Sequence, residues 1–501
     1  MPGDIMRVIF MTLPLYKIHK LFAQTPFVKP GSAVRHVSLI AGGTVVAQVI
    51  GILTIPIVSR IYSPSDYGVT AVYAFVVAVL GELSGLRYYF AIPLPKNEKY
   101  AKAIVVLSLG LHVVFVIVVA LILFIFGDFL LRNLSLTELI PYRALVPLGL
   151  LATGIYVTLT QWSIREKLFS PIARTKITQS LSGSATKILL GLLGMRPLGL
   201  LIGTIVAQGG GILTLLRSLL REKGIPHAGK EDLLRVALRY RKFPQYDTFS
   251  GLFITIGQKI SDVVFVALYS TSTAGLFVMA QQLLAIPSTF VGAAIGQVFL
   301  QRGSVAKQNG NLDALFARTC RTLMRLGFFP VLFISFFAPH LFSWFLGEQW
   351  RQAGVFARMI SPWIAINFVY SPISHVFSIL ERQNISLFFE LFHLPLRITA
   401  LYLGAHFGTE ETSLLFFVVV NFTMYLVKMF YLNNASGNSF GKLARSLFYE
   451  TLLSLTLLSI SFIPIIFNVN IIFLFLMIMG SLGAYSLSLW RFFTKKTTAV
   501  F

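Results

Sequence analysis

Charged residues are scarce in this chain, at 12% of 501 residues, whereas 56% are hydrophobic. That balance excludes a soluble multidomain enzyme, because a water-exposed surface of that size needs far more charge. The one cysteine, Cys320, excludes an intramolecular disulfide. The sequence contains no Walker-type Gly-Lys-Ser/Thr loop and no Cys/His metal-ligand spacing. We therefore expect no ATP hydrolysis, no catalytic residues, no metal site and no cofactor.

Acidic residues are the rarer charge type, since 19 Asp and Glu stand against 42 Lys and Arg and the net charge is +23. In a soluble protein such an excess favours a nucleic-acid partner. Here the basic residues gather in alternate loops between apolar runs, which is typical of membrane topology, and we expect no nucleic-acid partner. The opposite loops hold only Arg60, Arg132, Arg143, Lys187, Arg196, Arg351 and Arg358. This asymmetry predicts a multi-pass protein of the cytoplasmic (inner) membrane with both termini in the cytoplasm.

About fourteen apolar runs of roughly 20 residues are each long enough to span a bilayer as a helix. They are continuous rather than alternating, so they predict helices and not barrel strands. The expected fold class is an all-α polytopic membrane protein with about 14 transmembrane helices. The runs lie near residues 37–58, 68–93, 103–126, 144–164, 172–193, 198–220, 248–269, 275–300, 324–347, 355–380, 385–405, 412–432, 447–467 and 470–490.

The longest internal hydrophilic stretch, residues 221–247, separates two sets of six runs. Inside it an apolar stripe of Leu233, Leu234, Ala237 and Leu238 lies opposite basic residues, which predicts an amphipathic helix on anionic lipid; a solvated linker is the alternative. The predicted organisation is a cytoplasmic extension (1–36), a six-helix bundle (37–220), a cytoplasmic linker (221–247), a second six-helix bundle (248–432), two additional transmembrane helices (447–490) and a cytoplasmic tail (491–501).

An internal repeat relates the two bundles. Residues Ile61–Val69 align without gaps on Leu268–Leu276, and both segments join the first and second helices of their bundle. Six helices per repeat give both bundles the same orientation, which implies a pseudo-twofold axis along the membrane normal and a site between the halves. A chance similarity of two short polar turns is the alternative.

The segments that carry a family resemblance are Gly43–Gly51, Ile55–Gly68, Leu86–Tyr88, Ala91–Pro95, Ala274–Leu276, Pro287 and Gln297–Phe299. From about residue 37 to 440 the chain resembles the Wzx-type polysaccharide-unit flippases (O-antigen or exopolysaccharide) of the MOP exporter superfamily, which also holds MATE exporters and MurJ-type lipid II flippases. The resemblance implies that the first, second, seventh and eighth helices line a central cavity, with the last two helices outside. In one departure, Tyr89 occupies a position where the family often has Glu.

Ionisable residues deep inside apolar runs are the best pointers to a substrate path. Lys259 lies about 11 residues into the seventh run, roughly 16 Å along the helix and near the bilayer centre. Asp262 follows at i+3 on nearly the same face. We expect Lys259 to bind an anionic diphosphate and Asp262 to hold it or exchange a proton; a self-neutralising structural pair is the alternative.

In the eleventh run Glu390, His393 and Arg397 share one helix face, at about 100° per residue. They form either a proton-linked relay with Arg397 as a substrate contact, or a structural polar network. In the second run, Glu82 is the candidate for ion coupling and Arg87 for substrate entry, unless Arg87 snorkels to headgroups. Their spacing of five places them on different helix faces, which predicts that they do not pair.

Glutamines on the expected lining helices, Gln48 and Gln258 foremost, are candidates to bind sugar hydroxyls, with interhelical hydrogen bonding as the alternative. Lys187 is placed near the outer face, where snorkelling to headgroups competes with a functional role.

These observations predict a flippase that translocates polyprenyl-diphosphate-linked oligosaccharide units across the cytoplasmic membrane for surface polysaccharide biosynthesis. Proton or sodium coupling through Glu82 or Asp262 is a weaker hypothesis. The expected partners are this lipid-linked glycan, membrane lipids and other polysaccharide-assembly membrane proteins, and a monomer is expected. A MATE-like ion-coupled drug exporter is the main rival and predicts an acidic cavity. A membrane-embedded glycosyltransferase or polymerase is the second and predicts a large outside loop.

Overall fold

The computed structural model describes residues 33–223, 228–459 and 471–497, which form helices and turns without a β-strand. Most of the predicted extension (1–36) and parts of the linker, of the predicted helix 447–467 and of the tail lie outside these residues. The helices are α3 (Ala33–Ile61), α4 (Pro64–Ser84), η1 (Tyr88–Ala91), α5 (Glu98–Asn133), η2 (Thr137–Tyr142), α6 (Leu145–Arg165), α7 (Phe169–Leu192), α8 (Leu198–Gly209), α9 (Ile212–Lys223), α10 (Lys230–Arg239), η3 (Phe243–Asp247), α11 (Thr248–Leu268), α12 (Thr271–Leu284), η4 (Ser288–Gly292), α13 (Ala293–Gln308), α14 (Leu312–Leu346), η5 (Glu348–Trp350), α15 (Arg351–Ile373), α16 (Val376–Ile379), α17 (Gln383–Phe407), α18 (Glu410–Ala435), α19 (Phe440–Ser459) and α21 (Ile471–Thr497).

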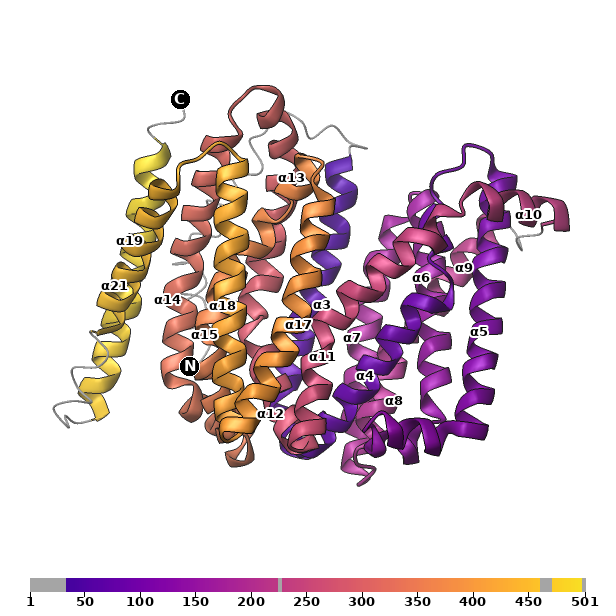
Figure 1. Cartoon of the computed structure of the whole chain (residues 1–501), viewed down its shortest axis with the longest axis horizontal. Coiled ribbons are helices and arrows are strands. Elements are labelled where there is room, and N and C mark those ends of the chain that lie inside the picture. The colour runs from indigo at the N-terminus through magenta and orange to yellow at the C-terminus, as the bar shows by residue number, and fades with distance from the viewer. Residues whose placement is uncertain (1–32, 224–227, 460–470, 498–501) are drawn as a thin grey trace, which may run out of the picture.

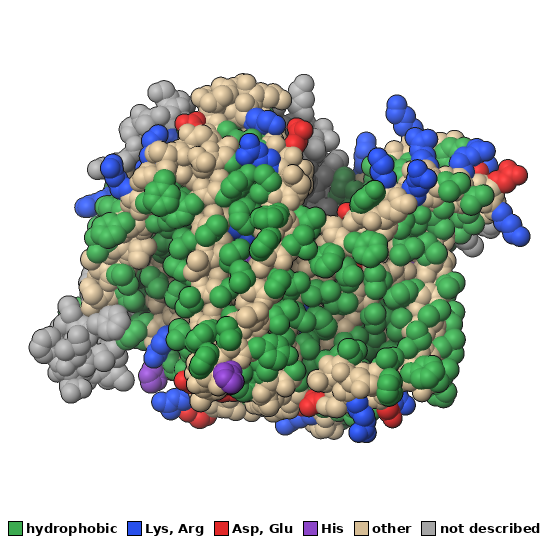
Figure 2. All heavy atoms as spheres, in the orientation of Figure 1, with side chains coloured by type: hydrophobic (Ala, Val, Ile, Leu, Met, Phe, Trp, Pro, Cys, Tyr) green, Lys and Arg blue, Asp and Glu red, His purple; other side chains and the backbone are tan. Residues whose placement is uncertain are grey.

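The described helices confirm an all-α polytopic membrane fold. Ten helical stretches among them are long and apolar enough to cross a bilayer, and an eleventh crossing results if α12 and the bent segment that ends in α13, at 48° to each other, count as one span. Figure 2 shows hydrophobic side chains over the middle of the molecule, with Lys and Arg gathered along the upper edge and fewer at the lower edge. The total of fourteen spans stays a prediction.

The helices form two bundles in Figure 1, which we call the N-terminal half (α3–α9) and the C-terminal half (α11–α18). Helices α4 to α10 lie on the right and α11 to α18 in the centre and left, while α19 and α21 lie at the left edge. The last two helices therefore pack outside the bundles, as the resemblance implies.

The second predicted helix, residues 68–93, is wrong at its C-terminal end. Helix α4 ends at Ser84, and Leu86 and Arg87 take left-handed backbone angles, with φ of 46° and 54°. A residue with left-handed backbone angles ends a helix and changes the direction of the chain, and here neither residue is a glycine. The chain therefore folds back into η1 instead of continuing the helix. The apolar pattern gave no sign of this break, because residues 88–92 are as hydrophobic as the helix before them.

The two repeat turns have the same local structure. Ser63 caps α4 by accepting a hydrogen bond from the Asp66 amide, and Ser270 caps α12 by accepting one from the Thr273 amide. Each serine satisfies a free amide of the first helical turn, which explains why both helices begin there. The repeat detected in the sequence therefore corresponds to a repeated helix start.

The linker helix α10 turns only part of the predicted apolar stripe toward the protein. Val236 is buried against the N-terminal half, and Asp232 pairs with Lys99 of α5 at 2.9 Å. Leu234 and Leu238 point away from the protein, 63% and 60% exposed. Leu233 of the stripe packs beside Val236, so only part of the stripe is covered, and two of its leucines remain free for lipid.

Candidate functional site

Three hollows meet in the middle of the molecule. The central hollow, of about 410 Å³, lies between the halves; one of about 370 Å³ lies on the N-terminal side and one of about 660 Å³ on the C-terminal side. Lys259 lines the central and N-terminal hollows, and Gln258 lines the N-terminal and C-terminal ones. Helix α11 therefore carries the point where the three hollows come together.

The central hollow is lined by α3, α4, α11 and α12, as the resemblance implies, and also by α7, α8 and η4. Gln48 and Asp262 are part of its wall, as expected. Lys259 lies 3.9 Å from the Asp262 carboxylate, at the outer limit of an ion pair, and its side chain is 47% exposed. Lys187, which was expected nearer the outer face, also lines this hollow, and its carbonyl accepts a hydrogen bond from the Tyr62 hydroxyl at 2.7 Å.

The N-terminal hollow holds Glu82, which has two partners. Arg87 Nε donates to one carboxylate oxygen at 2.7 Å, and Thr255 of α11 donates to the other at 2.9 Å. Tyr89 lines the same hollow, and burial raises the pKa of its phenol to about 12. At physiological pH Tyr89 thus contributes a neutral hydroxyl to this hollow.

Arg87 corrects a prediction, because it does pair with Glu82. The expectation assumed one continuous helix, in which residues five apart lie on different faces. The left-handed backbone at Leu86 and Arg87 instead turns the guanidinium back toward α4. Arg87 also donates to the Asp247 carboxylate at 3.0 Å, which links the N-terminal half to η3 at the start of α11. Arg87 is therefore a tie between the halves.

The C-terminal hollow is bounded by a buried cluster on α17 and α18. The three residues expected on one helix face do meet: Arg397 Nε lies 3.1 Å from His393 Nε2, and Glu390 joins them through Lys428. Lys428 Nζ lies 2.6 Å from Glu390 and 3.1 Å from His393 Nδ1. Arg397 Nε also donates to Asn421 Oδ1 at 2.8 Å, and the two terminal nitrogens donate to the Gly257 carbonyl at 2.5 Å and the Tyr425 hydroxyl at 3.2 Å.

This cluster lines the cavity, although α17 was not expected to be a main wall. Both Glu390 and Arg397 line the C-terminal hollow, and the bond to Gly257 holds Arg397 against α11. Sequence reasoning missed Lys428 and Asn421, which are both fully buried. Lys428 lies near the end of its predicted span, where a cation normally snorkels to headgroups. Its position seven residues after Asn421, on the same helix face, was the available signal.

The cavity wall pairs its acidic residues more completely than its basic residues. Its three acidic residues each have a cation nearby: Glu82 pairs with Arg87, Asp262 with Lys259, and Glu390 with Lys428. Two wall cations, Lys187 and Arg397, have no carboxylate within ion-pair distance among the residues that the structure describes. An unpaired cation in a low-dielectric wall is costly unless an anion arrives to neutralise it. The cavity is therefore suited to an anionic guest.

One end of the cavity is closed by backbone packing between the halves; we call it the turn end (residues 59–68 and 268–275). A Cβ on Gly68 would lie 1.9 Å from the Thr271 carbonyl oxygen, and one on Gly275 would lie 1.8 Å from that of Pro64. The Ser65 and Thr271 hydroxyls share a hydrogen bond of 2.8 Å. The two contacts are reciprocal, as a twofold relation between the repeats requires.

Further contacts join the same end to the C-terminal half. The indole of Trp350 donates to the Ser59 carbonyl at 2.8 Å and packs edge-on against the Tyr67 ring at 5.0 Å. Trp350 itself is fully buried. The turn end is thus a closely packed junction.

Comparison with known proteins gives one family and one fold. A family model described as polysaccharide biosynthesis protein matches residues 57–354. The lipid II flippase MurJ in an inward closed conformation superposes with a TM-score of 0.71 at 12% identity, over 92% of this chain and 99% of that one. An inward-facing multidrug resistance MATE transporter of the MOP superfamily gives 0.62 at 14% identity, over 78% and 98%. A MOP superfamily transporter from Pyrococcus furiosus gives 0.52 at 14% identity, over 81% and 96%. No curated protein gives a significant match.

Proposed function

Given that the chain belongs to the polysaccharide biosynthesis protein family, we propose that it is a flippase for polyprenyl-diphosphate-linked oligosaccharides in the cytoplasmic membrane. The observation that carries the proposal is the pair of cavity cations without acidic partners, Lys187 and Arg397. A diphosphate supplies the missing negative charge, and charge-assisted hydrogen bonds to it are among the strongest that a protein forms.

The diphosphate and sugars of the cargo lie in the cavity, and its lipid chain lies in the bilayer. The diphosphate lies between Lys187, Lys259 and Arg397, while sugar hydroxyls reach Gln48 in the central hollow and Gln258 in the adjoining ones. The polyprenyl chain stays in the hydrocarbon, because its burial in a polar cavity gains nothing. This division explains a cavity with few charges and many amides and hydroxyls.

Transport alternates between the two ends of the cavity. The turn end faces the outside in the predicted topology, and the end near Arg87 faces the cytoplasm. The cargo enters where a side-chain tie, Arg87 with Asp247, joins the halves. It leaves after the repeat turns separate, and rocking of the halves about the cavity connects the two states.

Ion coupling is assigned to Asp262 and Glu82, which both line the cavity. The Lys259 ammonium lies at the outer limit of ion-pair distance from the Asp262 carboxylate. When the cargo binds Lys259, a proton or a sodium ion therefore competes for the Asp262 carboxylate. The cluster of Glu390 and His393 is assigned a positioning role, since it holds Arg397 at the wall.

The rival function is a MATE-like exporter of cationic drugs, whose cavity needs unpaired carboxylates. Every acidic residue of the described cavity wall has a cationic neighbour, and the unpaired charges are positive. This observation favours an anionic cargo over a cationic drug.

The test uses source cells with and without the chain, and mass spectrometry of their lipid extracts. Loss of the chain is expected to cause a polyprenyl-diphosphate glycan to accumulate, inaccessible to an impermeant glycosidase added to spheroplasts. An unchanged lipid pool together with new drug sensitivity would overturn the proposal in favour of the exporter.

Lys187→Met tests the role of the unpaired cation. Removing a cation that interacts directly with the diphosphate is expected to weaken cargo affinity by about 10- to 100-fold, which corresponds to a charged hydrogen bond of roughly 1.5–3 kcal/mol. Because an unpaired buried charge costs stability, the Tm is expected to stay level or rise. Lys176→Met on the same helix is the control, since Lys176 lies over the Tyr156 ring instead of the cavity. Unchanged cargo affinity in Lys187→Met would remove the basis of the proposal.

A further inference from the structure

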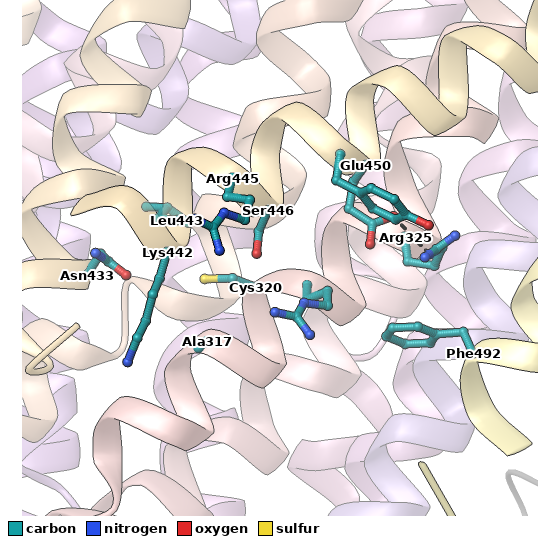
Figure 3. A pocket seen from close by; sticks show the side chains of 12 residues that line it. Ala317, Cys320, Arg325, Asn433, Lys442, Leu443, Arg445, Ser446, Glu450 and Phe492 are labelled. Carbon is teal, nitrogen blue, oxygen red and sulfur yellow. Dashed lines mark ion pairs between the residues drawn. The ribbon is translucent and has the colours of Figure 1, made fainter. Parts of the chain in front are cut away.

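A fourth hollow lies away from the cavity, between the C-terminal half and the last two helices. Its volume is about 410 Å³, and its walls come from α14, α18, α19 and α21. It shares no residue with the three hollows between the halves. Figure 3 shows Arg325 of α14 and Lys442 and Arg445 of α19 around this hollow, with Cys320 between them.

The charge of this pocket is strongly positive. Four cations line it, Arg321, Arg325, Lys442 and Arg445, against the single carboxylate of Glu450. Glu450 is 2% exposed and already paired with Arg325 Nε at 2.8 Å. Among the residues that the structure describes, no carboxylate lies within ion-pair distance of the other three cations. Three like charges are thus held around one hollow without a counter-ion from the described part of the chain.

Several contacts hold Arg325 in place at the wall of this pocket. Arg325 donates to the Ser488 hydroxyl at 2.9 Å, and its guanidinium lies 5.1 Å from the Phe492 ring. Ser488 and Phe492 belong to α21, so Arg325 also fastens that helix to α14. Ser446 adds a hydroxyl to the wall beside Arg445.

Apolar surface continues from the pocket along the outer helices. Phe448 and Leu452 of α19 are 70% and 49% exposed, and Leu487 and Trp490 of α21 are 49% and 56% exposed. Tryptophan at this position is typical of the membrane interface. A cationic hollow at the basic edge of the molecule, with exposed apolar side chains next to it, matches the two parts of a phospholipid.

We propose that this pocket binds the phosphate headgroup of an anionic phospholipid, whose acyl chains lie against α19 and α21. The phosphate bridges Arg321 of α14 and the two cations of α19, so the lipid holds the outer helices to the C-terminal half. A free phosphate shares the headgroup chemistry but leaves the apolar surface exposed, which favours the lipid as the occupant.

The test measures the Tm of the purified full chain in nonionic detergent with added phosphatidylglycerol, phosphatidylcholine or inorganic phosphate. Phosphatidylglycerol alone is expected to raise the Tm. In Arg321→Ala/Arg445→Ala, the concentration for half of this effect is expected to rise about 30-fold, since each basic residue contributes roughly fivefold. Arg318→Ala is the matched control, because Arg318 is an exposed cation one turn earlier on α14 that lines a different hollow.

Native mass spectrometry of bound phosphatidylglycerol gives an independent readout, and Arg321→Lys/Arg445→Lys is expected to keep it. If the double alanine variant does not yield a monodisperse protein, Lys442→Gln replaces it and is expected to lose about fivefold. An equal response of wild type and variant, an equal shift with phosphatidylcholine, or the same shift with inorganic phosphate would each overturn the proposal.

Discussion

The two junctions between the halves are held together by different kinds of contact. At the turn end, backbone meets backbone: Gly68 and Gly275 admit the partner segment so closely that neither position has room for a Cβ. Near the other end, the halves are joined through side chains: Arg87 reaches across to Asp247 at 3.0 Å, and Thr255 donates to Glu82 at 2.9 Å. The first junction is closely packed and reciprocal, whereas the second consists of polar, partly exposed side chains.

This difference indicates how the two ends are expected to behave. A side-chain ion pair that is partly exposed is worth about 1 kcal/mol and is replaced easily by a charged cargo. A packed backbone junction opens only as a unit, because interdigitated surfaces do not deform gradually. In our account the cargo itself breaks the Arg87 tie on entry, and the turn end opens in a separate, larger step.

The largest effect is expected from Gly275→Val, which breaks the packed junction. Its Cβ would meet the Pro64 carbonyl oxygen, so the segments must separate, at a cost typical of over-packing of roughly 1–3 kcal/mol or more. We expect transport in proteoliposomes to fall below about one tenth and the Tm to drop. Gly110→Ala is the control, because a Cβ there meets nothing within 4 Å. Normal transport and Tm in Gly275→Val would show that the turn end is not a tight junction.

A smaller effect is expected from Arg87→Ala, which removes the tie at the other end. The lost pairs with Glu82 and Asp247 are partly buried, so about 1–2 kcal/mol of stability is expected to be lost. Transport is expected to fall about three- to tenfold, because the entry tie and its phosphate contact disappear together. Arg143→Ala, which removes the pair with Asp128 within the N-terminal half, is expected to change neither quantity. Equal behaviour of the two variants would contradict a special role for Arg87.

The smallest effect on transport and Tm is expected from Ser65→Ala, which removes one hydrogen bond from the packed junction. The hydroxyl contact with Thr271 contributes about 0.5–1.5 kcal/mol, and the backbone packing beside it stays. Transport is expected to change by less than about threefold, with the Tm lowered slightly. A loss as large as that of Gly275→Val would mean that the hydroxyls, and not the glycines, close this end.

Much of the fold follows from the sequence, because apolar runs and the bias of basic residues are local patterns that the bilayer enforces. The repeat was visible for a related reason: Ser63 and Ser270 are helix caps, which leave a local signature. The end of α4 was missed, since a left-handed turn at Leu86 and Arg87 uses no glycine or proline and leaves no mark in the hydrophobicity.

The site was predictable where it depends on one helix and not where it depends on two. Glu390, His393 and Arg397 share a face of α17, so spacing alone brought them together. Lys428 joins them only through the packing of α18 on α17, and Lys187 enters the cavity only because α7 packs on α3. Contacts between different helices leave no periodic pattern in the sequence.

The most direct test of the account is a reversible cross-link at the turn end, in a chain whose single cysteine, Cys320, is replaced by alanine. Ser65→Cys/Thr271→Cys places two thiols where hydroxyls now lie 2.8 Å apart, within reach of a disulfide. Oxidation is predicted to reduce transport of the lipid-linked glycan in proteoliposomes below about one tenth, and reduction to restore it, because cargo leaves only when the repeat turns separate. Each single-cysteine variant should be unaffected by oxidation. Complete cross-linking with undiminished transport would contradict the account.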